Sequence, residues 1–144
     1  MHAPVPASAT DWAPADPQEI ATVLGAATVR WWLSGGAALD RWIGRAIRPR
    51  PNIDVSVVAA DLPALVAALP AGLSAWGPAD TEGEVIPLAD VPADVELQPV
   101  LVRDDTRGTW IMQVNVEDGT SAVWVYKRDP RLQLPWARAV LDID

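Results

Sequence analysis

The chain has 144 residues, with 19 acidic and 11 basic side chains and a formal net charge of −8. This length suits one domain with its own core, and the excess of acid argues against DNA or long RNA as a partner. The sequence has no cysteine and its one histidine is His2, which excludes disulfides and thiolate chemistry. Any acid–base or metal chemistry is therefore expected to use carboxylates.

Neither a leader peptide nor a membrane segment is predicted. The first residues contain no basic segment followed by an apolar run, which a signal peptide requires. Asp61 interrupts the longest apolar candidate, so no stretch reaches the roughly 18 residues of a membrane helix. We therefore expect a cytoplasmic protein without a membrane partner. Residues 1–15, rich in Pro, Ala and Ser, are expected to be flexible and to precede one domain over residues 16–144.

The first predicted elements are a helix and a strand. Asp16 is a good N-cap residue and Pro17 suits a first helical turn, so a helix is predicted from there to about residue 27. The aromatic and β-branched run 29–34 then predicts a strand that ends at Gly35-Gly36.

A second helix and a second strand follow. Apolar spacing predicts a helix over 37–45, and alternation predicts a strand over 53–58 that places Asn52, Asp54 and Ser56 on one face. Asp61 is expected to cap a helix over 62–69.

The rest of the chain predicts mainly strands. We expect them at 73–76, at 84–88 as an edge strand, at 94–102, and as a hairpin of 110–116 with 122–126, followed by a short helix from Pro135. The order of elements predicts an α/β (α+β) domain whose mixed sheet is flanked by helices.

Residues 34–54 have the composition of a phosphate and metal site. Gly35-Gly36 lets the backbone approach a ligand closely, and a following helix would direct free N–H groups there. Residues 52 and 54 lie roughly 6.6 Å apart along a strand and could converge on a pair of Mg²⁺ ions about 4 Å apart. Glu96 or Asp94, on a neighbouring strand, could supply a further carboxylate.

The stretch LSGGAALDRWIGRAIRPRPNIDV, residues 33–55, resembles the signature of small-molecule nucleotidyltransferases, which include aminoglycoside and lincosamide adenylyltransferases. The family pattern is Gly-Gly-Trp-Ala-Leu-Asp, a Gly-Arg, and Arg-x-His-x-Asp-Ile-Asp-Val. The segments WVYKRDPRL from Trp124 and VELQPV from Val95 resemble later parts of these proteins. The resemblance covers roughly residues 17–141 and implies the nucleotidyltransferase fold.

The resemblance also implies an activity: Mg²⁺-dependent transfer of a nucleoside monophosphate from an NTP to a hydroxyl of a small-molecule acceptor. It makes Asp54 and Glu96 catalytic residues, with Glu96 a metal ligand or general base. The implied site residues are Ser34, Gly35, Gly36, Arg48 and Arg50 for the nucleotide and Asn52, Asp54 and Glu96 for metal.

Departures from the family pattern leave alternatives open. Asn52 stands where the family has its first carboxylate, Arg50 replaces a histidine, and Glu96 is one methylene longer than the family's aspartate. A degenerate member would bind a ligand or a partner without nucleotidyl transfer, or run another reaction in the same cleft, for example in secondary metabolism. Members of the family usually add C-terminal helices that shape the acceptor pocket, and the resemblance implies that a chain without them would leave apolar surface open, which a homodimer would cover.

Overall fold

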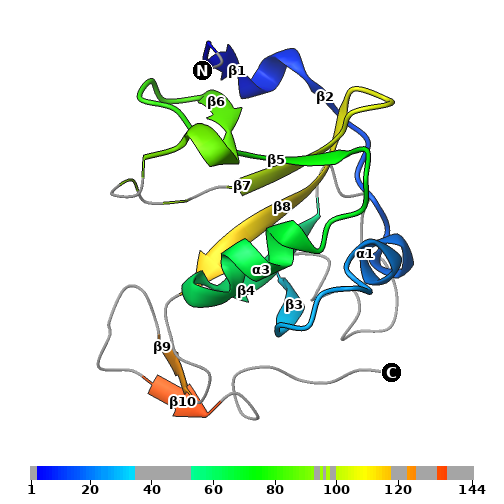
Figure 1. Cartoon of the computed structure of the whole chain (residues 1–144), viewed down its shortest axis with the longest axis vertical. Helices are drawn as coiled ribbons and strands as arrows, with labels where there is room; N and C mark the ends of the chain where they lie inside the picture. Colours follow the sequence, from blue (N-terminus) through cyan, green and yellow to red (C-terminus); the bar gives the residue numbers. More distant parts are fainter. Residues whose placement is uncertain are drawn as a thin grey trace.

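The protein is built on one mixed β-sheet (Figure 1). This computed structural model describes residues 3–34, 53–92, 95, 97 and 100–117, together with the backbone of residues 123–125 and 133–135. The sheet has the strand order β1-β6-β5-β7-β8-β4-β3, and β2 pairs with β8 off this path. Its strands are β1 (Val5–Pro6), β2 (Asp11–Trp12), β3 (Trp31–Ser34), β4 (Asp54–Val58), β5 (Leu73–Pro78), β6 (Glu84–Pro87), β7 (Val100–Asp104) and β8 (Thr109–Glu117).

The long strand β8 organises the sheet. It runs parallel to β2 and β4 and antiparallel to β7, while the pairs β3–β4, β5–β7, β5–β6 and β1–β6 are antiparallel. The register of β7 with β8 shifts between Val102 and Arg103, where Val102 pairs with Met112 and Arg103 with Trp110. This bulge turns Trp110 to the opposite face from Met112, so one strand supplies both apolar clusters of the protein.

Two short α-helices lie against the sheet. Helix α1 (Pro17–Val23) begins at Asp16, whose side chain accepts from the Glu19 N–H while the Glu19 side chain accepts from the Asp16 N–H, a complete capping box. Helix α3 (Leu62–Ala67) begins without a side-chain cap, because Asp61 ends a 3-10 turn and has helical rather than extended backbone angles. The predicted capping role of Asp61 is therefore wrong.

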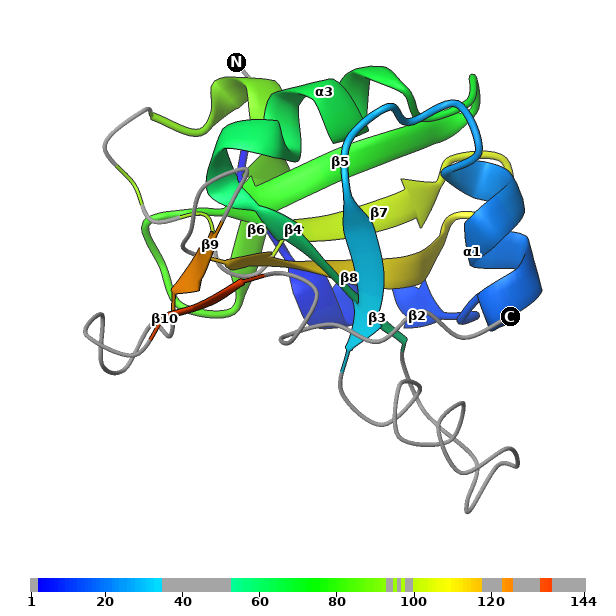
Figure 2. The same cartoon turned by 90° about the horizontal axis from the view of Figure 1, so that it is seen from below.

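The main core lies between these helices and one face of the sheet (Figure 2). Ile20 of α1 and Leu65 of α3 are buried against valines from β4, β7 and β8, which alternate along the strands as a half-buried sheet requires. The buried members of this cluster are Ala15, Ile20, Leu24, Ile53, Val55, Val57, Leu62, Leu65, Val100, Val102, Ile111, Met112, Val114 and Val116.

The predicted fold class, a helix-flanked nucleotidyltransferase-type α/β domain, is wrong for the part of the chain that the structure describes. That part is dominated by the eight-stranded sheet and contains only α1 and α3 as α-helices. The prediction gave too much weight to apolar periodicity and missed strands of two residues, whose pairing partners lie far away in sequence. The helix predicted over 37–45 lies outside the described residues.

Residues 1–15 were expected to lack regular structure, yet they carry β1, the 3-10 turn η1 (Ala7–Ala9) and β2. The N–H groups of Ala13 and Ala15 donate to the carbonyls of Trp110 and Ile111, and the indole N–H of Trp110 donates to the Ala7 carbonyl. The N-terminal segment is therefore bonded along the start of β8.

Two further predictions for the second half need correction, and a third concerns residues beyond the described ranges. Residues 95 and 97 lie outside any strand, so β7 starts at Val100 and not at residue 94. Strand β9 (Val123–Val125) pairs with β10 (Gln133–Pro135) in a separate sheet and forms no hairpin with β8. Pro135 is the last residue of β10, and the helix predicted to follow it lies outside the described residues.

Candidate functional site

The strand pair β3–β4 brings two of the predicted site residues together. Ser34, the last residue of β3, lies directly opposite Asp54, the first residue of β4, in the antiparallel ladder. The chain continues from Ser34 into Gly35 and reaches Asp54 from Asn52 and Ile53. The structure therefore places the start of the predicted metal strand beside the end of the strand that leads into the Gly-Gly pair.

Polar side chains surround Asp54 on one face of three adjacent strands. Gln113 of β8 is the parallel partner of Asp54, and Asn115 is the partner of Ser56. The amide of Gln113 donates from Nε2 to Asn115 Oδ1 at 2.9 Å, and Asn115 Nδ2 donates to Ser34 Oγ at 3.4 Å. Ser56 Oγ donates to the same Ser34 Oγ at 2.9 Å.

This polar face is the reverse of the apolar face that packs against the helices. Residues 55 and 57 of β4 and residues 114 and 116 of β8 are valines in the main core, while the polar residues occupy the alternate positions. Ser56 is only 1% exposed, and a buried hydroxyl is expected to need a hydrogen-bond partner. We call Gln113, Asn115, Ser34 and Ser56 the β3–β4–β8 polar chain.

The Asp54 carboxylate is not part of that chain. Its Oδ1 atom is buried and has no hydrogen-bond partner among the described residues. Desolvation by burial raises the pKa of Asp54 above its ordinary value, because a low-dielectric surrounding disfavours the charged form. A buried carboxylate oxygen without a donor is suited to receive a cation, so Asp54 fits the predicted Mg²⁺ ligand.

The remaining predicted site residues lie outside the described residues. They are Gly35, Gly36, Arg48, Arg50, Asn52 and Glu96, and the alternative Asp94 does too. The described residue of β7 that lies level with Asp54, across Gln113, is Leu101. Within the described ranges no three Asp, Glu or His side chains come together as a metal site. The metal, nucleotide and catalytic roles of the predicted site residues stay predictions.

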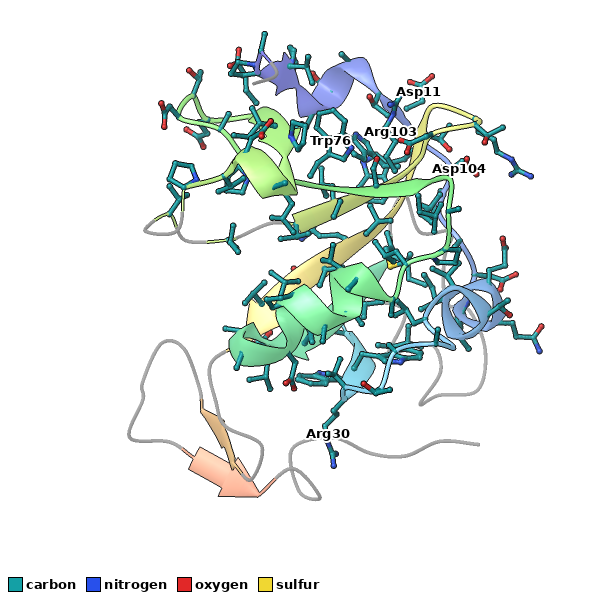
Figure 3. All side chains as sticks on the ribbon, viewed as in Figure 1. Asp11, Arg30, Trp76, Arg103 and Asp104 are labelled. Carbon is teal, nitrogen blue, oxygen red and sulfur yellow. The ribbon has the colours of Figure 1, made fainter. Side chains whose placement is uncertain are left out.

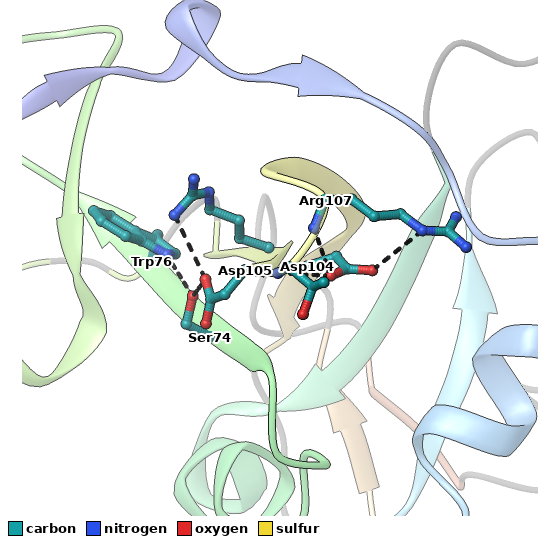
Figure 4. A network of polar contacts seen from close by, with 7 residues as sticks. Ser74, Trp76, Asp104, Asp105 and Arg107 are labelled. Carbon is teal, nitrogen blue, oxygen red and sulfur yellow. Dashed lines mark hydrogen bonds and ion pairs between the residues drawn. The ribbon is translucent and has the colours of Figure 1, made fainter.

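A second polar network surrounds the turn between β7 and β8 (Figure 4). Ser74 Oγ donates to Asp105 Oδ1 at 2.7 Å and accepts from the Trp76 indole at 2.9 Å. Asp104 Oδ1 accepts from the backbone N–H groups of Thr106 and Arg107, and its other oxygen lies 3.9 Å from Arg107 Nε. We call this set the turn network.

The turn network lies on β5 and at the turn between β7 and β8, whereas the β3–β4–β8 polar chain lies on β3, β4 and the middle of β8. Trp76, Arg103 and Asp104 gather towards the top of the view in Figure 3, and Arg30, next to β3, projects towards the bottom. Trp76 packs edge-on against Trp110, with ring centroids 6.1 Å apart. Trp110 is 1% exposed, so this tryptophan belongs to the core.

Gln113 and Asn115 have no role among the site residues predicted from the sequence. The alternation Met-Gln-Val-Asn-Val in β8 signals polar residues on one face of a strand. Their position next to Asp54 depends on the parallel register of β4 with β8, which no local pattern encodes. Ser56 was placed on the Asp54 face but was given no function.

Comparison with known proteins gives one positive finding. The model of the aminoglycoside-2''-adenylyltransferase family matches residues 18–129 of the chain. No protein of curated function matches it. The match spans more than half of the chain and includes both Ser34 and Asp54. No helix in the described ranges is long and apolar enough to cross a membrane.

Proposed function

The chain belongs to the aminoglycoside-2''-adenylyltransferase family, and on that premise we propose that it transfers a nucleoside monophosphate, in this family AMP, from an NTP to a hydroxyl group of an aminoglycoside-like small molecule. The observation that supports this most is the pairing of Ser34 with Asp54. It brings the strand end before the Gly-Gly pair next to a carboxylate whose buried Oδ1 atom has no hydrogen-bond partner in the part of the chain that the structure describes.

The proposed reaction is a displacement at the α-phosphorus. The acceptor hydroxyl oxygen forms a bond to phosphorus, the bond to the bridging oxygen of the β-phosphate breaks, and pyrophosphate leaves. The hydroxyl proton passes to a carboxylate base, a role that we assign to Glu96. Mg²⁺, when bound, would neutralise charge on the phosphate oxygens; Asp54 would hold it, with Asn52 and Glu96.

The other residues of the site would bind and orient the nucleotide. Ser34 and the backbone of Gly35 and Gly36 would donate hydrogen bonds to the phosphates, and Arg48 and Arg50 would add positive charge. Donors that are fixed in place before the reaction cost no reorganisation in the transition state, which is why a rigid strand end is a favourable support.

Asn52 favours a second candidate function, in which the protein binds a nucleotide or another small ligand without transferring it. An amide oxygen can ligate a cation but brings no charge, so two divalent ions would depend on Asp54 and one later acid. Nucleotidyl transfer depends on charge neutralisation at this point, whereas binding alone tolerates the loss more easily.

Calorimetric titration with Mg²⁺-ATP and Mg²⁺-GTP tests both candidates. Binding that Asp54→Ala abolishes supports a nucleotide site, and pyrophosphate release with a panel of aminoglycosides then tests transfer. If wild type binds no nucleotide and Asn52→Asp does, the transfer proposal is wrong and degeneration explains the sequence. If wild type binds but releases no pyrophosphate while Asn52→Asp does, the binding function is the correct one.

A further inference from the structure

The β3–β4–β8 polar chain lies in a part of the sheet where polar groups are costly. Ser56, in its middle strand, is 1% exposed, and the reverse face of the same strands is a valine core. A buried polar side chain destabilises the folded state unless it is hydrogen-bonded. Ser34, Gln113 and Asn115 are half-buried around Ser56, so this set of four polar side chains on three strands needs an explanation beyond packing.

The hydrogen bonds fix the orientation of each group in turn. Because Gln113 Nε2 donates to Asn115 Oδ1 at 2.9 Å, the Asn115 amide has its Nδ2 atom on the other side, where it donates to Ser34 Oγ at 3.4 Å. Gln113 thus determines which end of the Asn115 amide reaches Ser34.

Ser34 Oγ accepts two hydrogen bonds, one from Asn115 and one from Ser56 at 2.9 Å. A hydroxyl oxygen has two acceptor positions and one proton. With both acceptor positions filled, the Ser34 proton is left in the one remaining tetrahedral direction. No acceptor for this proton occurs among the described residues.

We propose that Asn115, oriented by Gln113 and assisted by Ser56, is a positioning residue that fixes the Ser34 hydroxyl as a hydrogen-bond donor to the phosphate groups of a bound nucleotide. This inference rests on the proposed function, in which Ser34 contacts phosphate. It assigns a role to three residues that have none in the family pattern described above. A donor oriented in advance binds phosphate without losing rotational freedom at the moment of binding.

The β3–β4–β8 polar chain also keeps an amide donor away from Asp54. Gln113 is the direct cross-strand neighbour of Asp54, yet its Nε2 donates to Asn115 and the Asp54 Oδ1 atom keeps no donor among the described residues. Gln113 therefore leaves this carboxylate oxygen available to a cation. The same polar chain thus orients Ser34, the donor to phosphate, and leaves Asp54 open as the metal ligand.

A double-mutant cycle on Mg²⁺-ATP binding tests the proposal, with calorimetry as the readout. We expect Ser34→Ala and Asn115→Ala each to weaken binding about tenfold, as for loss of one hydrogen bond to a charged group. Because Asn115 acts through Ser34, the double variant should also lose about tenfold, and not the roughly hundredfold of independent residues. Ser56→Ala removes a single oxygen and should weaken binding in the same direction even if Asn115→Ala fails to fold.

The matched control is Ser74→Ala. It removes from the turn network a hydroxyl that makes two hydrogen bonds, and it should leave Mg²⁺-ATP binding unchanged. Unchanged binding by Ser56→Ala and Asn115→Ala, or additive losses in the cycle, would overturn the positioning role and leave the proposed function standing. Absence of nucleotide binding by wild type would overturn both.

A readout without nucleotide separates the geometry from the function. In the free protein, the side-chain amide resonances of Asn115 should shift on Ser34→Ala and on Gln113→Ala in ¹⁵N-resolved NMR spectra, because each substitution removes one hydrogen-bond partner of that amide. If neither substitution shifts the Asn115 resonances, Gln113, Asn115 and Ser34 are not connected by hydrogen bonds, whatever the protein binds.

Discussion

The turn network and the β3–β4–β8 polar chain are both hydrogen-bonded sets of side chains on the same sheet, but they end differently. In the turn network, Asp104 accepts from the two N–H groups of its own turn, and Asp105 accepts from Ser74 and lies 3.6 Å from Arg103. In the polar chain, the adjacent Asp54 keeps a buried oxygen without a donor among the described residues. A carboxylate that is satisfied locally stabilises a turn, whereas one with an open oxygen is available to a ligand.

Asp54→Asn should separate the two sets most strongly. We expect loss of Mg²⁺-ATP binding by at least about 100-fold, because the change removes the negative charge that would hold the cation. Asp105→Asn is the matched control in the turn network and should bind as wild type does. Calorimetry on the three proteins measures this, and equal losses in both variants would contradict the assignment of function to Asp54 alone.

Gly108→Ala should damage the turn network without affecting the site. Gly108 has a positive φ of 70°, a conformation that costs a residue with a side chain about 1–2 kcal/mol. A Cβ atom there would meet Arg103 Nη2 at 3.5 Å, an ordinary contact, so the loss should come from backbone strain. Chemical denaturation should show this loss of unfolding free energy. Calorimetry should show that the variant binds Mg²⁺-ATP as wild type does.

Ser74→Ala should have a smaller effect on stability, about 0.5–1.5 kcal/mol for a lost hydrogen bond. The same change frees the Trp76 indole N–H and should alter the fluorescence of a tryptophan that is half-buried beside Trp110. A stability loss well above this range would mean that the turn network supports more of the core than its exposed position indicates.

The smallest expected effect is on the pH dependence of the metal-free protein. Burial raises the pKa of Asp54 in the folded state, so folding favours its protonated form. Relative to Asp54→Asn, wild type should therefore be less stable at neutral pH, and the difference should shrink as the pH falls below the raised pKa. Thermal melts of both proteins between pH 7 and pH 4 measure the difference. A gap that widens on acidification would contradict the effect of burial.

The elements whose signals are local were predictable from the sequence. Asp16, Pro17 and Glu19 encode the start of α1 within four residues, and alternation locates β4 and β8 because valines occupy every second position in part of each strand. Ser34 and Asp54 were selected from a motif with a physical rationale, and the structure pairs them. Their function is still a prediction.

The elements that depend on distant pairing were not predictable. Strands β1 and β2 have two residues each and form through partners about 80 to 100 positions away, so no window along the sequence contains their signal. The same reason applies to Asn115, whose contact with Ser34 spans 81 positions. A strand pattern gives the face of a residue, whereas its neighbours on that face follow only from register.

The bonds between the N-terminal segment and β8 have a consequence for the order of events during synthesis. The carbonyl of Ala7 accepts a hydrogen bond from the Trp110 indole, 103 positions later, so the segment around Ala7 cannot reach its place during synthesis until Trp110 has been made. Contacts of such long sequence separation slow folding. We expect β1 and β2 to dock last, and a large partner fused to the N-terminus to interfere with the yield of folded protein.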